Sequence, residues 1–361
     1  MAYKYEHLIP QNIAPRGATS IGIYDSNGRR IGGLSLGRLK PPTESKLYSF
    51  MALSDPHIPS EGDDGNRYGT GVPDLQRALT YAEISDCAFT CICGDLTAAG
   101  TNDQLARYKS VVEEYAKTKP VYAMGGNHET ARATGLGNMT FDRLTPYTGK
   151  PMYYSFEQGN DVFIMLSHYG QEQSNGSWLS SEFVSVEELQ WLYATLEANR
   201  NKRCFVFNHC FPYDDRVGDA NRLYGAQNWR TQDGSIGEAF INLLKHYKNT
   251  ILFHGHSHLR LKLQERDKMA NYSSEVGYRS VHIPSVAVPK DYTGTSDLYV
   301  VEESEGYVVD VYENFIVLNG RDFIDNDANG HGIGIATYKI DTTLQIIAPN
   351  TFTDNTGIIN T

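Results

Sequence analysis

Residues 48–57 read Tyr-Ser-Phe-Met-Ala-Leu-Ser-Asp-Pro-His. The mostly apolar first half predicts a buried β-strand, and Asp55 and His57 follow where that strand ends. In extended backbone, residues two positions apart point to the same side, so these two side chains could bind one cation together. A single Asp-x-His triplet is a weak signal, because most such triplets lie in surface loops. The stretch therefore predicts a site only if other strand ends carry matching side chains.

From residue 47 onward, short apolar runs alternate with helical stretches, which is typical of a layered α/β domain. We expect strands at residues 48–53, 88–93, 121–124, 162–166, 204–207, 251–253 and 280–286. Helices are expected to begin after Thr101, Ser185 and Ser235. Each of these residues stands three positions before a Gln or Glu, which is the capping-box spacing.

Four further clusters of ligand-type residues follow predicted strands, at the edge where open α/β sheets place their sites. They are Cys93-Gly94-Asp95, Gly125-Gly126-Asn127-His128-Glu129, Phe207-Asn208-His209-Cys210 and His254-Gly255-His256-Ser257-His258. Alone, each is a weak to moderate signal, because Gly-Asp is a common turn and a single buried His is more often a core residue than a ligand. Together they supply carboxylate, amide and imidazole groups, a mixture that suits Mn, Fe or Zn better than Ca or Mg.

The Gly-Asn-His-Glu cluster offers separate roles to neighbouring residues. Asn127 can present an amide oxygen to a metal, whereas His128 is better placed as a proton donor. Glu129 is then expected to fix the orientation of the His128 ring. His254 is interpreted as a buried strand residue and receives no role.

Composition narrows the classes of function. The chain carries a net charge of −11 and no Lys/Arg cluster, so no clear nucleic-acid surface is expected. Its five cysteines lie near apolar runs and favour buried thiols over disulfides or a structural zinc site. The sequence shows no signal-peptide core and no membrane-spanning run. A cytoplasmic location is therefore the default expectation, and a virion-associated one stays open.

The chain is expected to divide into three parts. Residues 1–45 contain an Asn-Gly turn between apolar runs and predict an accessory N-terminal β-hairpin. Residues 46–290 form the catalytic domain, and residues 291–361 form a β-rich segment that completes the sheet or caps the domain. Residues 1–45 either pad the main domain or bind an oligomer or assembly partner.

At the five clusters the sequence resembles the calcineurin-like metallophosphoesterase superfamily, whose pattern is Asp-x-His, Gly-Asp, Gly-Asn-His-Asp/Glu, His and Gly-His-x-His. The resemblance spans about residues 47–290, and the ordered series is highly specific. The nearest general likeness is to bacterial or phage phosphodiesterase-type members. This resemblance implies a β-sandwich flanked by helices, with a dinuclear metal site at one edge.

The resemblance also implies a role for each residue. One metal would bind Asp55, His57, Asp95 and His258, and the other Asp95, Asn127, His209 and His256. Two cations about 3.5–4 Å apart would hold a bridging hydroxide that attacks phosphorus. The catalytic residues would be His128 as proton donor, Asp95 and Glu129, and the substrate contacts would be Asn127, His128 and Arg216. The expected activity is hydrolysis of an organic phosphoester, with phosphodiesters favoured.

Two departures narrow the subfamily. Purple acid phosphatases place a Tyr ligand three residues after the bridging Asp, where this chain has Ala98. Protein Ser/Thr phosphatases follow Gly-Asp with Asp-Arg-Gly, whereas this chain continues with Leu96 and Thr97. Arg216 and His168 have plain alternatives, the first as a solvated loop residue and the second as a strand cap.

A second class of function is a binding or assembly component, for example of a phage-like particle, built on the same fold. Such relatives typically lack metal ligands or the catalytic His, and here every position is filled, which favours an enzyme. The enzyme and the assembly component could also be the same protein, if the chain attaches to a particle through residues 1–45 and cleaves a surface phosphodiester polymer.

Overall fold

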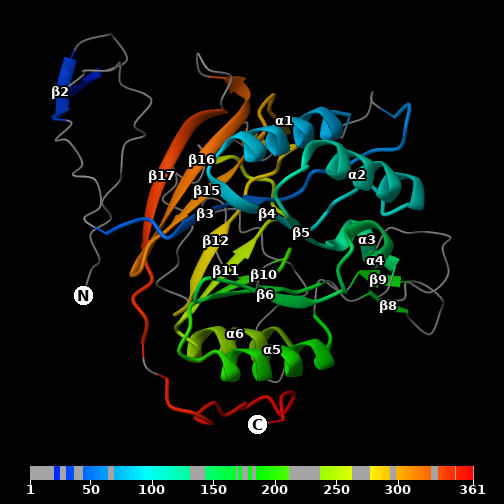
Figure 1. The fold of residues 1–361 in the computed structure, drawn as a ribbon, viewed down its shortest axis with the longest axis vertical. Helices are drawn as coiled ribbons and strands as arrows, with labels where there is room; N and C mark the ends of the chain where they lie inside the picture. Colours follow the sequence, from blue (N-terminus) through cyan, green and yellow to red (C-terminus); the bar gives the residue numbers. More distant parts are fainter. Residues whose placement is uncertain are drawn as a thin grey trace.

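Two β-sheets face each other, and helices cover the outer face of each (Figure 1). The computed structural model describes residues 20–24, 30–35, 44–63, 69–130, 143–167, 170–172, 178–180, 184–210, 236–261, 277–292, 298–326, 332–345 and 347–360. The order of layers is helix, sheet, sheet, helix. The predicted mixed α/β class with helices flanking a β-sandwich is confirmed.

The first sheet has six strands in the order β17-β16-β15-β3-β4-β5. They are β3 (Tyr48–Leu53), β4 (Cys87–Cys93), β5 (Val121–Met124), β15 (Glu305–Val311), β16 (Phe315–Asn326) and β17 (Gly332–Asp341). Strands β3, β4 and β5 are parallel, whereas β15 runs antiparallel to β3. The strands near the C-terminus therefore continue the sheet that β3 begins.

The second sheet has five strands in the order β12-β11-β10-β7-β6. They are β6 (Tyr154–Gln158), β7 (Asp161–Met165), β10 (Cys204–Phe207), β11 (Thr250–His254) and β12 (Arg279–His282). All neighbours pair in parallel except β6, which forms an antiparallel hairpin with β7. Parallel strands buried on both faces read as continuous apolar runs, which is why these segments were recognisable in the sequence.

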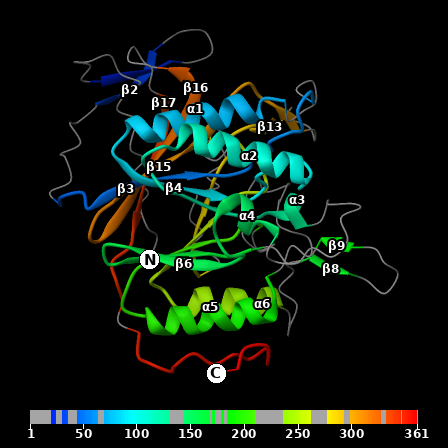
Figure 2. The ribbon, with the colours of Figure 1, turned by 45° about the vertical axis from the view of Figure 1, so that its right-hand side comes forward.

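Helices α1 (Gly71–Ile84) and α2 (Asn102–Tyr115) cover the six-stranded sheet, and α5 (Val186–Ala198) and α6 (Ile236–His246) cover the five-stranded one (Figure 2). The short helices α3 (Asn127–Thr130) and α4 (Thr145–Thr148) follow β5 along the chain. Three small antiparallel pairs complete the described elements: β1 (Ser20–Tyr24) with β2 (Arg30–Ser35), β8 (Gly170–Glu172) with β9 (Trp178–Ser180), and β13 (Lys290–Tyr292) with β14 (Leu298–Val300).

An aromatic core holds the two sheets together. Phe50 of β3 meets Phe163 of β7 edge-on at 5.1 Å between ring centroids, and Phe163 stacks on Phe205 of β10 at 4.7 Å. These three side chains are fully buried. Each contributes roughly 1.5–3 kcal/mol through burial of apolar surface, so the contact between the sheets is a rigid base for the loops at the strand ends.

Several local predictions can be checked against the structure. Strand β12 ends at His282, before the predicted limit of 286, because the chain leaves the sheet and Ser285 bridges to Ser54. Ser185 caps α5 by accepting a hydrogen bond from the Glu188 amide, as predicted. Helix α2 begins directly after Thr101, as predicted, but the Thr101 side chain makes no capping hydrogen bond. Ser235 lies outside the described residues.

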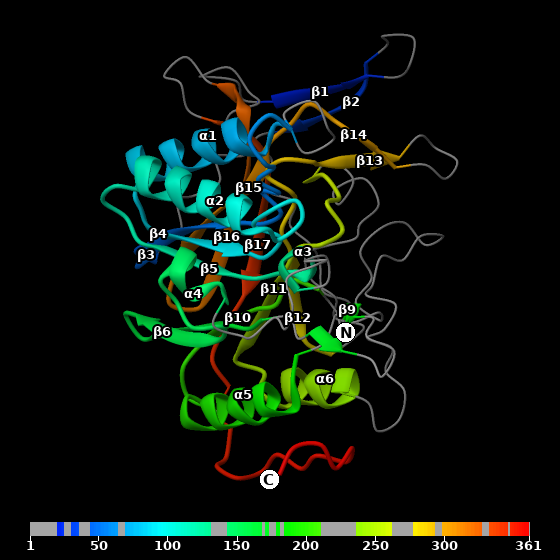
Figure 3. The same ribbon diagram turned by 90° about the vertical axis from the view of Figure 1, so that its right-hand side faces the viewer.

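The N-terminal and C-terminal segments differ in their secondary structure. Strands β1 and β2 pair antiparallel with each other, and their turn lies outside the described residues. After β17, the described part of residues 343–360 contains no strand and passes beneath α5 and α6 (Figure 3). Phe352 and Ile359 are buried there against the helices. The boundaries at residues 45 and 290 stay predictions. Among the described residues no helix is long and apolar enough to cross a membrane.

Candidate metal centre

Loops from both sheets meet where their parallel strands end. The clusters after β3 and β4 are joined by backbone hydrogen bonds, from the Asp55 amide to the Gly94 carbonyl at 3.2 Å and from the His57 amide to the Asp95 carbonyl at 3.0 Å. Those after β10 and β11 are joined by the Gly255 amide, which donates to the His209 carbonyl at 3.0 Å. These bonds bring side chains from segments far apart in sequence into one place.

The backbone at this place is strained. Among the described non-glycine residues, six have a positive φ, and five of them belong to the predicted ligand set. Their φ angles are 55° for Asp55, 45° for His57, 49° for Asp95, 71° for His256 and 62° for His258. Conformations of this kind cost of order 1–3 kcal/mol each and concentrate at functional sites, because the surrounding structure must hold them.

One group of donors, here called the first donor group, consists of Asp55, His57, Asp95 and His258. Each offers one ligand atom, and these atoms all lie within 4.8 Å of one another. The Nε2 atom of His258 is 2.9 Å from Asp55 Oδ1, and the Nε2 atoms of His57 and His258 are 3.0 Å apart. All four residues are buried, so few waters can satisfy these atoms. The set is the one predicted for the first metal.

The charge state of Asp55 suits a ligand. Burial alone would raise the pKa of Asp55, but the imidazoles of His258 and His209 outweigh it and hold the pKa well below its usual range. Ser54 donates to the Oδ2 atom at 2.6 Å and the His256 amide donates to it at 3.1 Å. The Oδ1 atom is buried and accepts no hydrogen bond of satisfactory geometry. A cation would satisfy it.

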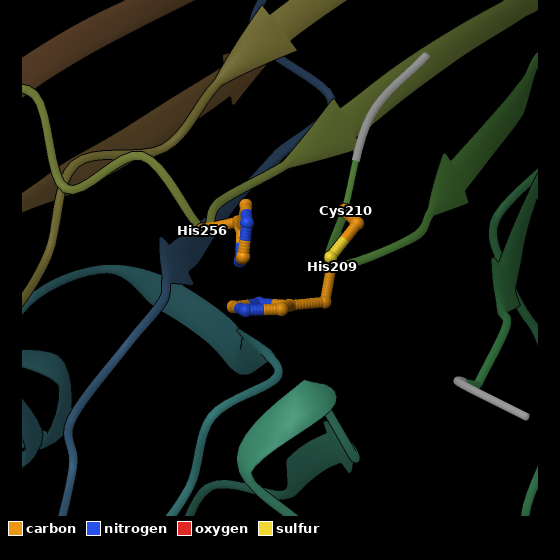
Figure 4. Close-up of side chains that lie close together, drawn as sticks. All are labelled: His209, Cys210 and His256. Atoms are coloured by element: carbon orange, nitrogen blue, oxygen red, sulfur yellow. The ribbon is translucent and has the colours of Figure 1, made fainter. Parts of the chain in front are cut away.

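A second donor group consists of His209, Cys210 and His256, whose ligand atoms also lie within 4.8 Å of one another (Figure 4). The Nδ1 atom of His256 is 2.9 Å from Asn127 Oδ1, and His209 Nε2 is 3.1 Å from Asp95 Oδ2. The structure thus brings Asn127, His209 and His256 together beside Asp95, as expected for the second metal. Cys210 was not predicted to take part.

Histidine protonation at the second group follows from its neighbours. Burial would lower the pKa of His209, but the carboxylates of Asp95 and Asp55 raise it to about 10. For His256, burial and the nearby His209 lower the pKa to about 3. This place therefore attracts positive charge while leaving His256 neutral. A buried cation bound by a neutral imidazole and a carboxylate fits both tendencies.

His128 lies beside the donors without joining either group. Its Nδ1 is 2.6 Å from the Ala98 carbonyl, its Nε2 is 3.7 Å from Asp95 Oδ2, and its amide donates to Asp95 Oδ1 at 2.8 Å. The carbonyl can only accept, so Nδ1 carries a proton and Nε2 faces the donors. The Nε2 atom is therefore the ring atom on the side of Asp95.

The expectation that Glu129 orients the His128 ring is wrong, because the Ala98 carbonyl does so. The carboxylate of Glu129 instead accepts from the Gly126 amide and from the amide and hydroxyl of Thr97, each at 2.8 Å. Burial and the neighbouring Asp95 raise the pKa of Glu129 to about 7. Glu129 therefore ties the loop after β4 to the loop after β5.

The structure also shows supporting residues that were not predicted from the sequence. Ser257 Oγ is 2.6 Å from His282 Nε2, a contact between the Gly-His-x-His loop and the end of β12. Ser285 Oγ donates to the Asp55 carbonyl at 2.9 Å. Both partners lie in the run 280–286 that predicted only a strand, and a polar side chain inside an apolar run was the available signal. His254 is buried and contacts Ser280 Oγ at 3.1 Å, as a core residue does.

Two predicted residues cannot be placed. Arg216, proposed as a substrate contact, and His168 lie outside the described residues.

Comparisons with known proteins agree with this geometry. The sequence model for the family "calcineurin-like phosphoesterase" matches residues 48–260. Among solved structures, a dimetal phosphatase from Danio rerio is similar with a TM-score of 0.50 and 17% identity, covering 81% of this chain and 99% of that one. A purple acid phosphatase from yellow lupin (Lupinus luteus) seeds has a TM-score of 0.50 and 15% identity, covering 83% and 55%. Comparison with curated proteins gave no match.

Proposed function

The chain belongs to the calcineurin-like phosphoesterase family, and from this premise we propose that it hydrolyses an organic phosphoester with two metal ions, preferring phosphodiesters. The observation that carries the proposal is the convergence of two donor groups from four strand ends, with Asn127 from a fifth strand end beside them. The strained backbone at five of these residues supports it, because a fold retains such strain where a site requires it.

The donors present fit two cations. Asp55, His57, Asp95 and His258 would hold one ion, and Asp95, Asn127, His209 and His256 the other. Mn, Fe or Zn ions bound there would activate a water molecule as nucleophile and neutralise negative charge on the phosphoryl oxygens. Asn127, through its amide group, is also proposed to orient the phosphoryl group.

His128 would act as the general acid. With Nδ1–H donating to the Ala98 carbonyl, the ring is held in one orientation and presents Nε2 toward the donors. When protonated on both ring nitrogens, His128 could give its Nε2 proton to a departing alkoxide. A phosphodiester with an alkyl leaving group needs such a donor, because an alkoxide is a poor leaving group.

The preference for diesters rests on the likeness to phosphodiesterase-type members, and on Ala98 standing where purple acid phosphatases carry a Tyr ligand. The structural relative from Danio rerio is named a phosphatase, so monoester hydrolysis is the alternative to be separated.

The test is a screen of monoesters against diesters on the purified chain, with Mn²⁺ added and bound metal measured. We expect two metal ions per chain and a higher kcat/KM on diesters, with activity lost on chelation. A chain that binds two ions but cleaves no ester would instead support a role as an assembly component. Faster hydrolysis of monoesters would contradict the diester preference alone.

A further inference from the structure

Cys210 is the only cysteine of the five that lies in a donor group. It follows His209 directly at the end of β10, and its side chain is fully buried. Figure 4 shows its sulfur beside the rings of His209 and His256. His209 and His256 were predicted as metal ligands from the sequence, but Cys210 was not.

The remaining cysteines occupy ordinary core positions. Cys93 Sγ contacts Met124 Sδ at 4.0 Å and the Phe253 carbonyl at 3.7 Å. Cys204 Sγ lies near the carbonyls of Asn199 and Lys202. All five cysteines are buried and form no disulfide, so burial by itself does not distinguish Cys210. What distinguishes it is the set of ligand atoms around its sulfur.

Those ligand atoms converge from three segments. Asn127 Oδ1 lies 3.9 Å from Cys210 Sγ and 2.9 Å from His256 Nδ1. The Nδ1 atom of His209 is 2.7 Å from the Cys93 carbonyl, which turns the other ring nitrogen toward Asp95. An amide oxygen, a thiol and two imidazoles therefore surround one position.

An independent observation points to a cation at the adjoining first donor group. Asp55 Oδ1, which belongs to the first donor group, is buried and accepts no hydrogen bond of satisfactory geometry, although the Nε2 atoms of His258 and His209 lie 2.9 Å and 3.7 Å from it. A carboxylate oxygen left in that state inside a protein is costly unless an ion compensates it. The thiol therefore lies beside a place that already requires positive charge.

We propose that Cys210 supplies a thiolate ligand to the second metal position, which makes that position prefer zinc or iron over manganese. The inference rests on the proposed function and adds that the two metal positions differ in their ligands. The first donor group holds only nitrogen and oxygen ligands and suits a harder ion, whereas thiolates select softer ones. On binding, the thiol loses its proton to solvent and the sulfur lone pair forms the bond to the metal.

Cobalt spectroscopy tests the thiolate directly. The 361-residue chain is loaded with Co²⁺, and its near-ultraviolet absorption is recorded for the wild type, Cys210→Ser and Cys93→Ser. We expect a thiolate-to-cobalt charge-transfer band in the wild type, its loss in C210S and its retention in C93S. Cys93 is a matched control because it is also buried and stands two residues from a proposed ligand.

Two further measurements do not depend on activity. X-ray absorption of the zinc-loaded wild type should show a sulfur neighbour at about 2.3 Å from zinc, and this requires no variant to fold. In C210S, zinc affinity at one of the two positions should fall about tenfold or more, because even loss of an outer supporting contact has effects of that size. Manganese affinity should change less.

The possible outcomes distinguish failure of the Cys210 proposal from failure of the proposed phosphoesterase function. A wild type that binds two cobalt ions without the band, or a C210S variant that keeps it, overturns the thiolate and leaves the proposed function standing. A wild type that binds no cobalt overturns both.

Discussion

Single residues at the strand ends hold conformations that the rest of the fold must stabilise. Asp55, His57 and Asp95 adopt positive φ, and backbone hydrogen bonds between their loops keep them there. The Ala98 carbonyl, 2.6 Å from Nδ1, likewise helps to orient the His128 ring. Because these side chains are positioned individually, substitutions here should separate metal binding from proton transfer.

Replacing His128 by Ala should remove the proton donor while leaving both donor groups intact. We expect two metals per chain, as in the wild type, and a loss of about 10²–10⁴-fold in kcat on an alkyl phosphodiester. The loss should be smaller with a nitrophenyl leaving group, which departs without protonation. Metal analysis and kinetics on both substrates check this. Wild-type turnover of the alkyl ester would rule out the acid role.

Gly94 illustrates a site that tolerates no side chain. Its φ is +80°, and an added Cβ would lie 2.5 Å from Cγ of the His209 ring. Gly62 has a similar φ of +84°, but an added Cβ there would have no atom within 4 Å. It is therefore a control for the backbone strain at Gly94 without the close contact to His209. Gly62→Ala should cost only the left-handed backbone penalty of about 1–2 kcal/mol in the free energy of unfolding.

Gly94→Ala should cost more than that and should also weaken zinc binding, since His209 must move. Chemical denaturation and zinc titration of both variants provide the comparison. Equal losses of stability with unchanged zinc affinity would show that the close approach to His209 has no role.

Helix α5 connects the fold to the site at the scale of an element. Ser185 directly precedes the helix and caps it. Glu188 lies in the first turn, and its carboxylate accepts a hydrogen bond from the Ser167 amide, just after β7, at 2.6 Å. Leu189, Leu192 and Leu196 lie on the same buried face of the helix and pack against the five-stranded sheet. The helix start is therefore held by both polar and apolar contacts.

The cap at Ser185 can be measured against a residue that looks the same in sequence. Ser185 and Thr101 have nearly the same backbone angles at their helix starts, but only Ser185 accepts a hydrogen bond from its helix. Ser185→Ala should lower the free energy of unfolding by about 1 kcal/mol, and Thr101→Ala by less than about 0.5 kcal/mol. Denaturant unfolding of both variants is the measurement, and a larger loss for T101A would contradict it.

Glu188 should make stability depend on pH. Burial raises the pKa of Glu188 from about 4.5 to about 8, so in this interval the folded chain keeps a proton that the unfolded chain has lost. Its contribution to stability is full below pH 4.5 and disappears as pH rises toward 8. Glu188→Gln should flatten the fall in Tm between pH 5 and 8. Glu187→Gln, at an exposed neighbour, should leave the fall unchanged.

At the scale of the whole molecule, strands β1 and β2 form a two-stranded sheet of their own, whereas β15–β17 extend the sheet that contains β3. The C-terminal strands are therefore part of the main core. Lys46 pairs with Asp86 and Asp310, and the Leu47 amide donates to the Val311 carbonyl, which joins the start of the domain to β15.

Deleting residues 1–45 should thus leave the core folded, with a change in Tm of less than about 2 °C and with metal binding retained. Light scattering of both forms would report any oligomer that depends on the segment. Loss of an oligomer with activity kept would support an assembly role for residues 1–45. An unfolded product would contradict the prediction and show that the segment pads the domain.

Much of this architecture was predictable because its signals are local. The apolar runs at β3, β5 and β10 are bounded as predicted. For β3 and β10 the reason is that a strand buried on both faces needs consecutive apolar residues. The misjudged features are side-chain hydrogen bonds. Thr101 stands at its helix start without making a capping bond, and Glu129 accepts hydrogen bonds from Gly126 and Thr97 instead of orienting His128; residue spacing does not specify such bonds.

The sequence by itself determined the layered α/β class, the family and the set of polar residues gathered at strand ends. Only the tertiary structure decided how those residues are grouped. It placed Cys210 beside His209 and His256, assigned the His128 ring to the Ala98 carbonyl, and brought Ser285 to Asp55. The physical reason is range. Burial and backbone propensity act over a few residues, whereas ligand geometry depends on loops separated by up to about 200 residues meeting at one edge of two packed sheets.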